Sequence, residues 1–278
     1  MNAPVIEIDD LVVRVAERTL LAVPQLRIAQ GERVAIVGHN GAGKSTLLRV
    51  LAGFVPSAGG SVRVLGRELG PQLRGARLRS LRAEIGQVLQ GLHLVPRLTA
   101  RENVLIGALA RVPGWRSWAR LYPPNLLAEA DTALAAVGLL SRADERADRL
   151  SGGERQKLSI ARMRLQQARL ILADEPTANL DPTAAAEACG WLTEAAAGAT
   201  LLTVVHQPGL LPLLADRVIG LAHGGVLYDG PVGDATPSLL RSLYETAPTE
   251  SRPAAGWGAK TSLTVKHFLP ASAPQTCT

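Results

Sequence analysis

Aromatic residues and cysteines are scarce in this sequence. Phenylalanine, tyrosine and tryptophan make up 3% of the 278 residues, and only two cysteines are present. Cys189 and Cys277 show neither metal-ligand nor redox spacing, so we interpret both as incidental residues of a chain in a reducing cytoplasm. The alternation of basic and aromatic residues that grips single-stranded nucleic acid is also missing, with Trp115 and Trp118 as its only candidates. We therefore expect no nucleic-acid partner.

Long uncharged hydrophobic runs are absent as well. No stretch of about 18 apolar residues occurs, so we do not expect the chain to cross a membrane by itself. The opening MNAPVIEIDDLVV carries acids where a signal peptide carries basic residues, and no secretory leader is expected. Hydrophobic residues nevertheless amount to 47%, which is enough for a substantial globular core.

The net charge of +6 does not decide the function. Arginine clusters in residues 73–82 and 111–120. Such basic surface can meet the phosphates of nucleic acid or of anionic lipid headgroups. A solvated helix face explains each cluster equally well.

Short apolar runs alternate with helical patterns along the chain. The runs RVAIVG, RLILAD and TLLTVV end at residues 38, 174 and 205 and are typical of buried strands. Because helical segments separate them, they predict a parallel sheet covered by helices. Residues 5–15 and 61–69 instead alternate with a period of two and predict antiparallel strands.

The middle and the end of the chain have a different texture. From about residue 91 to 165 the pattern is helical, which predicts a helical subdomain inserted in the α/β core. Residues 218–230 predict a hairpin. Residues 246–278 are rich in Pro, Ala, Ser and Thr and predict a disordered tail behind one domain over residues 1–245.

The stretch GHNGAGKST fits the phosphate-loop pattern G-x-x-x-x-G-K-[ST]. Its glycines let backbone N–H groups close around phosphates, and the helix that follows adds the positive end of its dipole. The strand before it and the helix after it favour this interpretation over a chance glycine-rich turn. We expect Lys44 to reach the β- and γ-phosphates and the Ser45 hydroxyl to coordinate Mg²⁺. The predicted binding residues are Gly38, His39, Asn40, Gly41, Ala42, Gly43, Lys44, Ser45 and Thr46.

Polar residues end several of the strand-like runs. Asp174 and Glu175 follow LILA, where the first predicts a Mg²⁺ ligand and the second a base that polarises the attacking water. His206 closes LLTVVH and Gln90 closes IGQVLQ, so both are expected at the same sheet edge. Gln90 is predicted to contact Mg²⁺ or the water. The predicted catalytic residues are Lys44, Gln90, Glu175 and His206, and the predicted metal ligands are Ser45, Gln90 and Asp174.

A second glycine turn, SGGE, opens another helix at Ser151. Its hydroxyl and free backbone N–H groups suit a γ-phosphate. Ser151 and Glu154 also match a capping box, but a capping box does not require Gly152 and Gly153. If two copies pack head-to-tail about a twofold axis, each turn covers the nucleotide held by the other. We therefore predict that Ser151, Gly152, Gly153 and Glu154 bind the nucleotide of a second copy.

The phosphate loop, LSGGERQ, LILADEPTANLD and VVH, in this order, resemble the ATP-binding subunit of an ABC transporter over about residues 5–245. The resemblance implies ATP and Mg²⁺ as cofactors. It implies an α/β fold with a P-loop NTPase (RecA-like) core, an antiparallel β subdomain and an inserted α-helical subdomain. By motif, Gln90 matches the Q-loop glutamine, His206 the switch histidine, residues 151–154 the signature motif, and Asp181 ends the D-loop at the dimer interface.

A finer resemblance, to the subunits of phosphonate importers, lies in LHLVPRLTARENVLIGALARVPGWRSW and in VLYDGP. It implies import of phosphonate or a related phosphorus oxyanion such as phosphite. It also implies a second copy, separate transmembrane permease subunits and, indirectly, a solute-binding protein as partners. The chain is then expected peripherally on the cytoplasmic face of the inner membrane, with the permease contact near residues 90–95.

The sequence departs from the family at Arg14 and Val15, where an aromatic residue usually stacks on adenine. Stacking is worth about 1–3 kcal/mol, so ATP affinity is expected to fall unless the Arg14 guanidinium stacks instead. Leu89 is a lesser departure, since a phenylalanine commonly precedes the Q-loop glutamine.

Other functions remain open from the residues. ATPases of lipid or lipoprotein exporters share a stretch like LVPRLTARENV, and related ATPases act in soluble assemblies such as those of carbon–phosphorus lyase. A degenerate nucleotide sensor is a third alternative, which the complete set of Lys44, Asp174, Glu175 and His206 opposes.

Overall fold

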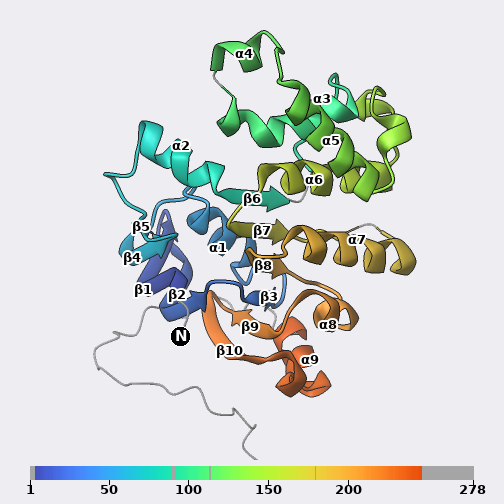
Figure 1. The fold of residues 1–278 in the computed structure, drawn as a ribbon. Coiled ribbons are helices and arrows are strands. Elements are labelled where there is room, and N and C mark those ends of the chain that lie inside the picture. Colours follow the sequence, from blue (N-terminus) through green and yellow to red (C-terminus); the bar gives the residue numbers. More distant parts are fainter. Residues whose placement is uncertain (1–3, 89–91, 113, 179, 246–278) are drawn as a thin grey trace, which may run out of the picture.

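The computed structural model describes residues 4–88, 92–112, 114–178 and 180–245 (Figure 1). Gln90, Leu89, Cys277 and the predicted tail lie outside the described residues. The strands are β1 Pro4–Val15, β2 Arg18–Ala29, β3 Arg33–Val37, β4 Gly59–Val64, β5 Arg67–Glu68, β6 Ile85–Val88, β7 Leu170–Asp174, β8 Thr200–Val204, β9 Arg217–Ala222 and β10 Gly225–Pro231. The α-helices are α1 Lys44–Leu51, α2 Gly75–Ala83, α3 Ala100–Leu105, α4 Gly114–Trp118, α5 Pro124–Ala136, α6 Gly152–Gln166, α7 Pro182–Ala195, α8 Leu211–Leu214 and α9 Pro237–Glu245.

A six-stranded sheet, in the order β10-β9-β3-β8-β7-β6, forms the centre of the fold. From β9 to β6 all neighbours are parallel, and β10 pairs antiparallel with β9 as the predicted hairpin. Val34 and Ile36 of β3 face one hydrophobic cluster, whereas Ala35 and Val37 face the other. Because both faces are covered, these strands read as continuous apolar runs, and the predicted parallel sheet is confirmed.

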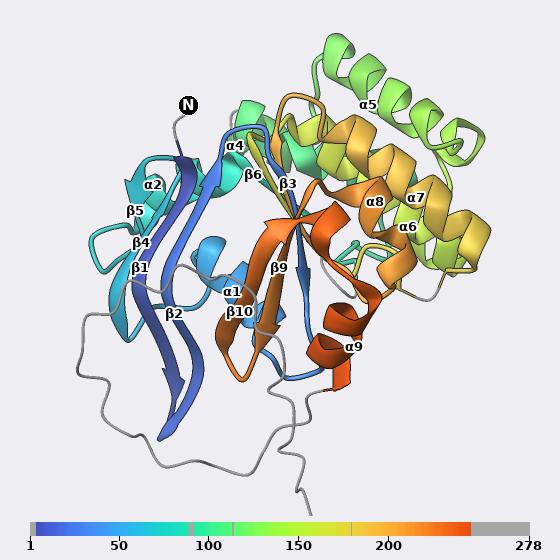
Figure 2. The same cartoon turned by 90° about the horizontal axis from the view of Figure 1, so that it is seen from below.

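A smaller antiparallel sheet, in the order β2-β1-β4-β5, lies on one side of the central sheet, with α1 between the two (Figure 2). Residues 5–15 and 61–69, whose apolar residues alternate with a period of two, form β1 and most of β4 and β5, as predicted. The sequence analysis did not assign β2, whose twelve residues pair with β1 along nearly their whole length. The apolar side chains of this sheet join α1 and one face of the central sheet in a single cluster.

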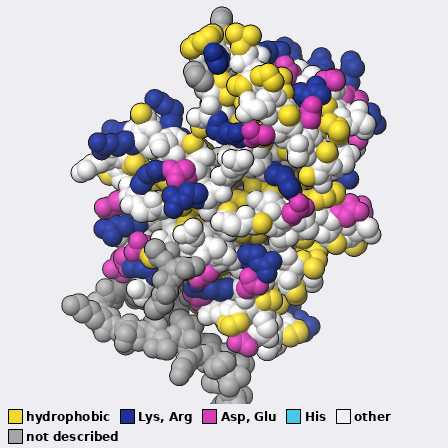
Figure 3. Space-filling model, viewed as in Figure 1, with side chains coloured by type: hydrophobic (Ala, Val, Ile, Leu, Met, Phe, Trp, Pro, Cys, Tyr) yellow, Lys and Arg dark blue, Asp and Glu magenta, His cyan; other side chains and the backbone are white. Residues whose placement is uncertain are grey.

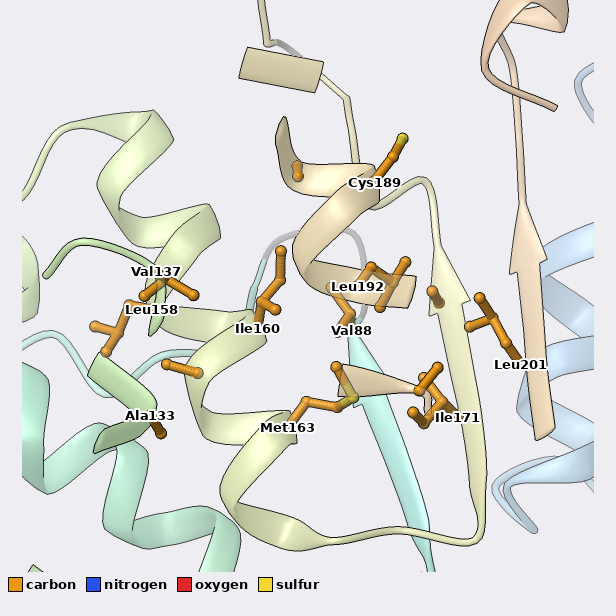
Figure 4. Packing of buried hydrophobic residues seen from close by; sticks show 14 of the residues in the cluster. Val88, Ala133, Val137, Leu158, Ile160, Met163, Ile171, Cys189, Leu192 and Leu201 are labelled. Atoms are coloured by element: carbon orange, nitrogen blue, oxygen red, sulfur yellow. The ribbon is translucent and has the colours of Figure 1, made fainter. Parts of the chain in front are cut away.

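Helices cover the opposite face of the central sheet and extend beyond its β6 edge (Figures 1 and 2). The helix α6 packs against α3, α5 and α7. Figure 4 shows its side chains between those of α5 and those of the sheet: Leu158 lies toward α5, and Met163 toward the strands. The predicted helical stretch therefore consists of α3 to α6, and α6 joins it to the core.

Two features identified in the sequence fall outside the site described below. Residues 73–82 cover the turn before α2 and most of the helix, where Arg74, Arg77 and Arg79 are exposed. Lys and Arg side chains gather on the left of Figure 3, the side on which α2 lies in Figure 1. Cys189 is buried in α7, and burial raises the pKa of its thiol to about 11, so the reactive thiolate is suppressed. No helix in the described parts of the chain has the length and apolar character to cross a bilayer.

Candidate functional site

The strand order brings the predicted site residues to one edge of the sheet. The adjacent parallel strands β3, β8 and β7 run into the phosphate loop, His206 and the pair Asp174–Glu175, respectively. Ligands of open α/β sheets bind outside the carboxyl ends of such strands. The chain leaving β6 starts at this same edge and leads to Gln90.

The phosphate loop requires glycine for reasons internal to the chain. Gly38 has φ 146°, and a Cβ at this position would lie 2.1 Å from the carbonyl oxygen of Leu221. Gly43, which caps α1, has φ 100°, and its Cβ would lie 2.5 Å from the Leu21 side chain. Any larger residue at either position would displace its neighbours, so the loop passes where only glycine fits.

Lys44 folds back over this loop. Its Nζ donates hydrogen bonds to the carbonyl oxygens of Gly38, at 2.7 Å, and of His39, at 2.9 Å. The side chain is buried, and burial lowers the pKa of Lys44, although the carboxylates of Glu175 and Asp174 oppose this shift. A buried ammonium group that bonds to neutral carbonyls of this loop gains further charge stabilisation from an anionic ligand, so the loop fits a nucleotide phosphate.

Ser45 and Asp174 place two oxygen ligands beside the loop. Ser45 Oγ donates to Asp174 Oδ1 at 3.2 Å, and Asp174 is only 6% exposed. Burial raises the pKa of Asp174, against the hydrogen bond from Ser45, which lowers it. Within the described residues, no group of three or more His, Cys, Asp and Glu side chains gathers to hold a metal. The pair thus fits Mg²⁺ that takes its other ligands from phosphates and water.

Glu175 and His206 touch directly. His206 Nε2 lies 2.6 Å from Glu175 Oε1, although 31 residues separate them in the chain. Glu175 has φ 53°, the left-handed region that non-glycine residues rarely enter and that often marks functional sites. On the other side, Tyr244 of α9 donates its hydroxyl to the carbonyl of Val205 at 2.8 Å, which fixes the backbone beside His206. The sequence predicted a shared sheet edge but not this contact.

The second glycine turn forms the predicted capping box. The N–H of Glu154 donates to Ser151 Oγ at 3.2 Å, and the N–H of Ser151 donates to Glu154 Oε2 at 2.8 Å. The hydrogen bond from the Ser151 N–H lowers the pKa of the Glu154 carboxyl, and the Ser151 hydroxyl lowers it further. A Cβ on Gly152 would meet nothing within 4 Å, and one on Gly153 only the Leu180 side chain at 3.9 Å. Neither glycine has a positive φ, so the chain's own packing does not require glycine at either position.

Two polar residues of α6, which the sequence analysis did not select, hold loops at the site. Gln156 donates from Nε2 to the carbonyl of Pro176, next to Glu175. Arg162 donates to the carbonyls of Leu92 and His93, each at 2.8 Å, and burial lowers its pKa. Gln156 is the last residue of LSGGERQ, so the motif itself could have pointed to it. Arg162 is one polar residue within the helical pattern of residues 152–166, which does not single it out.

The position of the missing aromatic residue is a hairpin tip. Arg14 and Val15 end β1, with Val15 59% exposed, and pair with Thr19 and Arg18 of β2. Within the described residues, no cation–π contact involves Arg14 or Arg18. The effect on adenine binding, and stacking by Arg14, remain predictions.

Comparison with known proteins gives a consistent result. A sequence profile described as ABC transporter matches residues 21–178. The phosphonates import ATP-binding protein PhnC of Cupriavidus pinatubonensis is 45% identical over 240 residues, covering 84% of this chain and 85% of that protein. A protein of the same name from Rhodopseudomonas palustris is 42% identical over 221 residues, covering 79% of each chain. A dimeric ATP-binding cassette solved after hydrolysis with ADP and Pi superimposes with a TM-score of 0.72 at 27% identity, covering 82% of this chain and 98% of that one.

Proposed function

We propose that this chain, which belongs to the ABC transporter family, is the ATP-hydrolysing subunit of an importer for phosphonates or a related phosphorus oxyanion. The observation that carries the proposal is the gathering of phosphate loop, Asp174, Glu175 and His206 at one sheet edge. The cargo rests on the 45% identity to a phosphonates import ATP-binding protein.

Each residue of the sheet edge has a distinct part in hydrolysis. The loop from Gly38 to Thr46 binds the phosphates, and Lys44 exchanges its carbonyl partners for the β- and γ-phosphates. Ser45 and Asp174 hold Mg²⁺, which offsets charge on the phosphates. Glu175 orients the attacking water and accepts its proton, while His206 holds the Glu175 carboxylate. Gln90 contacts Mg²⁺ or the water.

A second copy completes each site. The turn Ser151–Glu154 is proposed to cover the γ-phosphate of ATP held by the other chain, since its glycines leave bare backbone at the start of α6. ATP then joins the two copies, and hydrolysis separates them. Asp181 accepts from the N–H groups of Thr183 and Ala184, both at 3.0 Å, so it shapes the interface loop by capping α7.

The other partners follow from the import role named for the relatives. Transmembrane permease subunits form the pathway, and a solute-binding protein delivers cargo to them. The chain sits peripherally on the cytoplasmic face of the inner membrane. We place the permease contact on the helical subdomain of about residues 91–165, near Val95, whose side chain is 41% exposed.

The test is ATPase activity in vesicles that contain the neighbouring permease and the cognate binding protein. Methylphosphonate, phosphite, phosphate and no ligand are compared, with Glu175→Gln as the inactive control. We expect one phosphorus oxyanion to stimulate wild-type hydrolysis. Equal activity with every ligand, or no association with the permease, would contradict the cargo and favour lipid export or a soluble assembly.

A further inference from the structure

The helix α6 is bonded to the loop that carries the catalytic carboxylate. Gln156 is buried, only 6% exposed, and its amide donates to the carbonyl of Pro176. Ser159 Oγ in turn donates to the carbonyl of Gln156 at 2.8 Å. A buried amide–carbonyl bond of this kind has no competing water, so it fixes the position of the peptide it holds.

The carbonyl that Gln156 holds lies in the turn that directly follows Glu175. Pro176 directly follows Glu175, whose φ of 53° departs from ordinary strand geometry. The carbonyl of Glu175 accepts a hydrogen bond from the N–H of Ala178 at 3.1 Å, which closes a tight turn. A small rotation of this turn therefore changes the distance between the Glu175 carboxylate and His206.

The same helix begins at the turn that would bind the partner's ATP. Ser151 caps α6, and Gln156 lies a little over one helical turn farther on. Gly153, in the first turn, faces the Leu180 side chain, which a Cβ on Gly153 would meet at 3.9 Å. Because a helix moves as a rigid unit over this distance, displacement of its first turn is carried to Gln156.

We propose that Gln156 is a positioning residue that couples the two ATP sites of the dimer. ATP from the partner, bound at the first turn of α6, orients Glu175 of the same chain through Gln156 and Pro176. Each chain then hydrolyses its own ATP fast only when its α6 is occupied. This inference rests on the composite site of the proposed function.

The chain offers a closely matched control. Gln166, at the other end of α6, also donates its amide to backbone carbonyls, those of Arg82, Ala83 and Ile85, at 3.2, 3.1 and 2.8 Å. These carbonyls lie far from Glu175 in the fold. Gln156→Met and Gln166→Met each remove a donor while nearly conserving volume. Gln156→Leu, which removes the donor without introducing a charge, serves as a second variant if Gln156→Met folds poorly.

ATP-dependence curves of hydrolysis measure the coupling. For wild type we expect a Hill coefficient approaching about 2, the number of sites in the dimer. Gln156→Met should bring it close to about 1 and lower kcat by about three- to tenfold, the effect of one lost hydrogen bond. Gln166→Met should keep the wild-type Hill coefficient even if its melting temperature falls. In the Glu175→Gln background, Gln156→Met should still dimerise with ATP.

Two results would overturn the inference alone: a wild-type Hill coefficient in both Gln156 variants, or an equal fall in the Gln166 control. Failure of Glu175→Gln to dimerise with ATP while Gln156 is intact would instead overturn the composite site itself. The two failures are distinguishable because dimerisation of Glu175→Gln is measured with an unchanged α6, whereas the coupling is measured with Gln156 replaced.

Discussion

The two glycine turns that open α1 and α6 look alike in sequence and differ in what their glycines do. The fold of the chain itself requires glycine at positions 38 and 43. Both residues have positive φ angles, and a Cβ at either position would clash with a neighbouring residue. Gly152 and Gly153 have neither constraint. The first turn is thus explained within one chain, whereas the second is not.

This difference indicates where each turn finds its ligand. The loop before α1 is closed by Lys44, which already bonds to the loop carbonyls. The start of α6 satisfies its capping needs through Ser151 and Glu154, and the two glycines between them stay open. Because packing within the chain does not require glycine at positions 152 and 153, we infer that these residues leave room for a ligand from another molecule, the ATP bound by a second copy.

The largest expected effect is that of Lys44→Ala, which breaks the first turn. Loss of the ammonium group removes charge stabilisation from the transferred phosphate, so turnover should fall about 10³-fold and nucleotide binding should weaken. A fluorescent ATP analogue and a phosphate-release assay measure both effects. Lys157→Ala, which removes a lysine lying over the Trp191 ring, is the control. Unchanged turnover in Lys44→Ala would refute the phosphate-loop assignment.

Gly152→Glu should break the second turn without harming the fold. The new side chain has open space, and an acid in the first turn of a helix is favourable, so the melting temperature without nucleotide should not fall. Repulsion of the γ-phosphate should reduce ATP-dependent dimerisation, and turnover, by about 10²-fold. Size-exclusion chromatography with ATP measures the dimer. A normal dimer would show that the turn does not face a nucleotide.

Unlike Gly152→Glu, Gly38→Ala should lower the stability of the protein in the absence of nucleotide. The added Cβ collides with the Leu221 carbonyl, so we expect a loss of about 2–3 kcal/mol in the free energy of unfolding. Gly152→Ala should leave the melting temperature unchanged or raise it, because alanine favours a helix. Equal losses in urea unfolding of the two variants would remove the distinction between the turns.

The smallest effect concerns pH and Mg²⁺ at Asp174. Burial raises the folded-state pKa of Asp174, so the stability that this group contributes is present at low pH and lost as pH rises through that pKa. Above it, Mg²⁺ compensates the buried carboxylate. In the presence of a non-hydrolysable ATP analogue, the Mg²⁺-induced gain in the free energy of unfolding should therefore be larger at high pH than at low pH, by about 1 kcal/mol or less. Asp174→Asn should reduce this pH dependence to the part that the γ-phosphate of the analogue contributes, and an equal pH dependence in wild type and Asp174→Asn would contradict the prediction.

Local pattern was sufficient to predict the central sheet, the phosphate loop and the capping box, because each depends on neighbouring residues. The contact of Glu175 with His206 and the bond from Gln156 to Pro176 were not predictable in the same way. The first depends on the order of the strands and the second on how α6 packs against the loop after β7. The periodicity of one sequence predicts helices and strands but not how they are arranged in space. The strand β2 was missed because Pro24 interrupts its alternating pattern, and a proline within such a run counts against a strand unless it lies at a sheet edge, as β2 does.

The most direct test of the composite site is to mix two inactive variants, Lys44→Ala and Gly152→Glu. In a mixed dimer, one site combines the intact phosphate loop of the Gly152→Glu chain with the intact α6 turn of the Lys44→Ala chain. The other site carries both defects. We predict that ATP hydrolysis, strongly reduced in either variant alone, partly recovers on mixing. It should not exceed the rate of Gln156→Met, because the α6 turn of the Gly152→Glu chain stays without ATP in the mixed dimer. No recovery, with mixed dimers demonstrated by an affinity tag on one chain, would contradict the account.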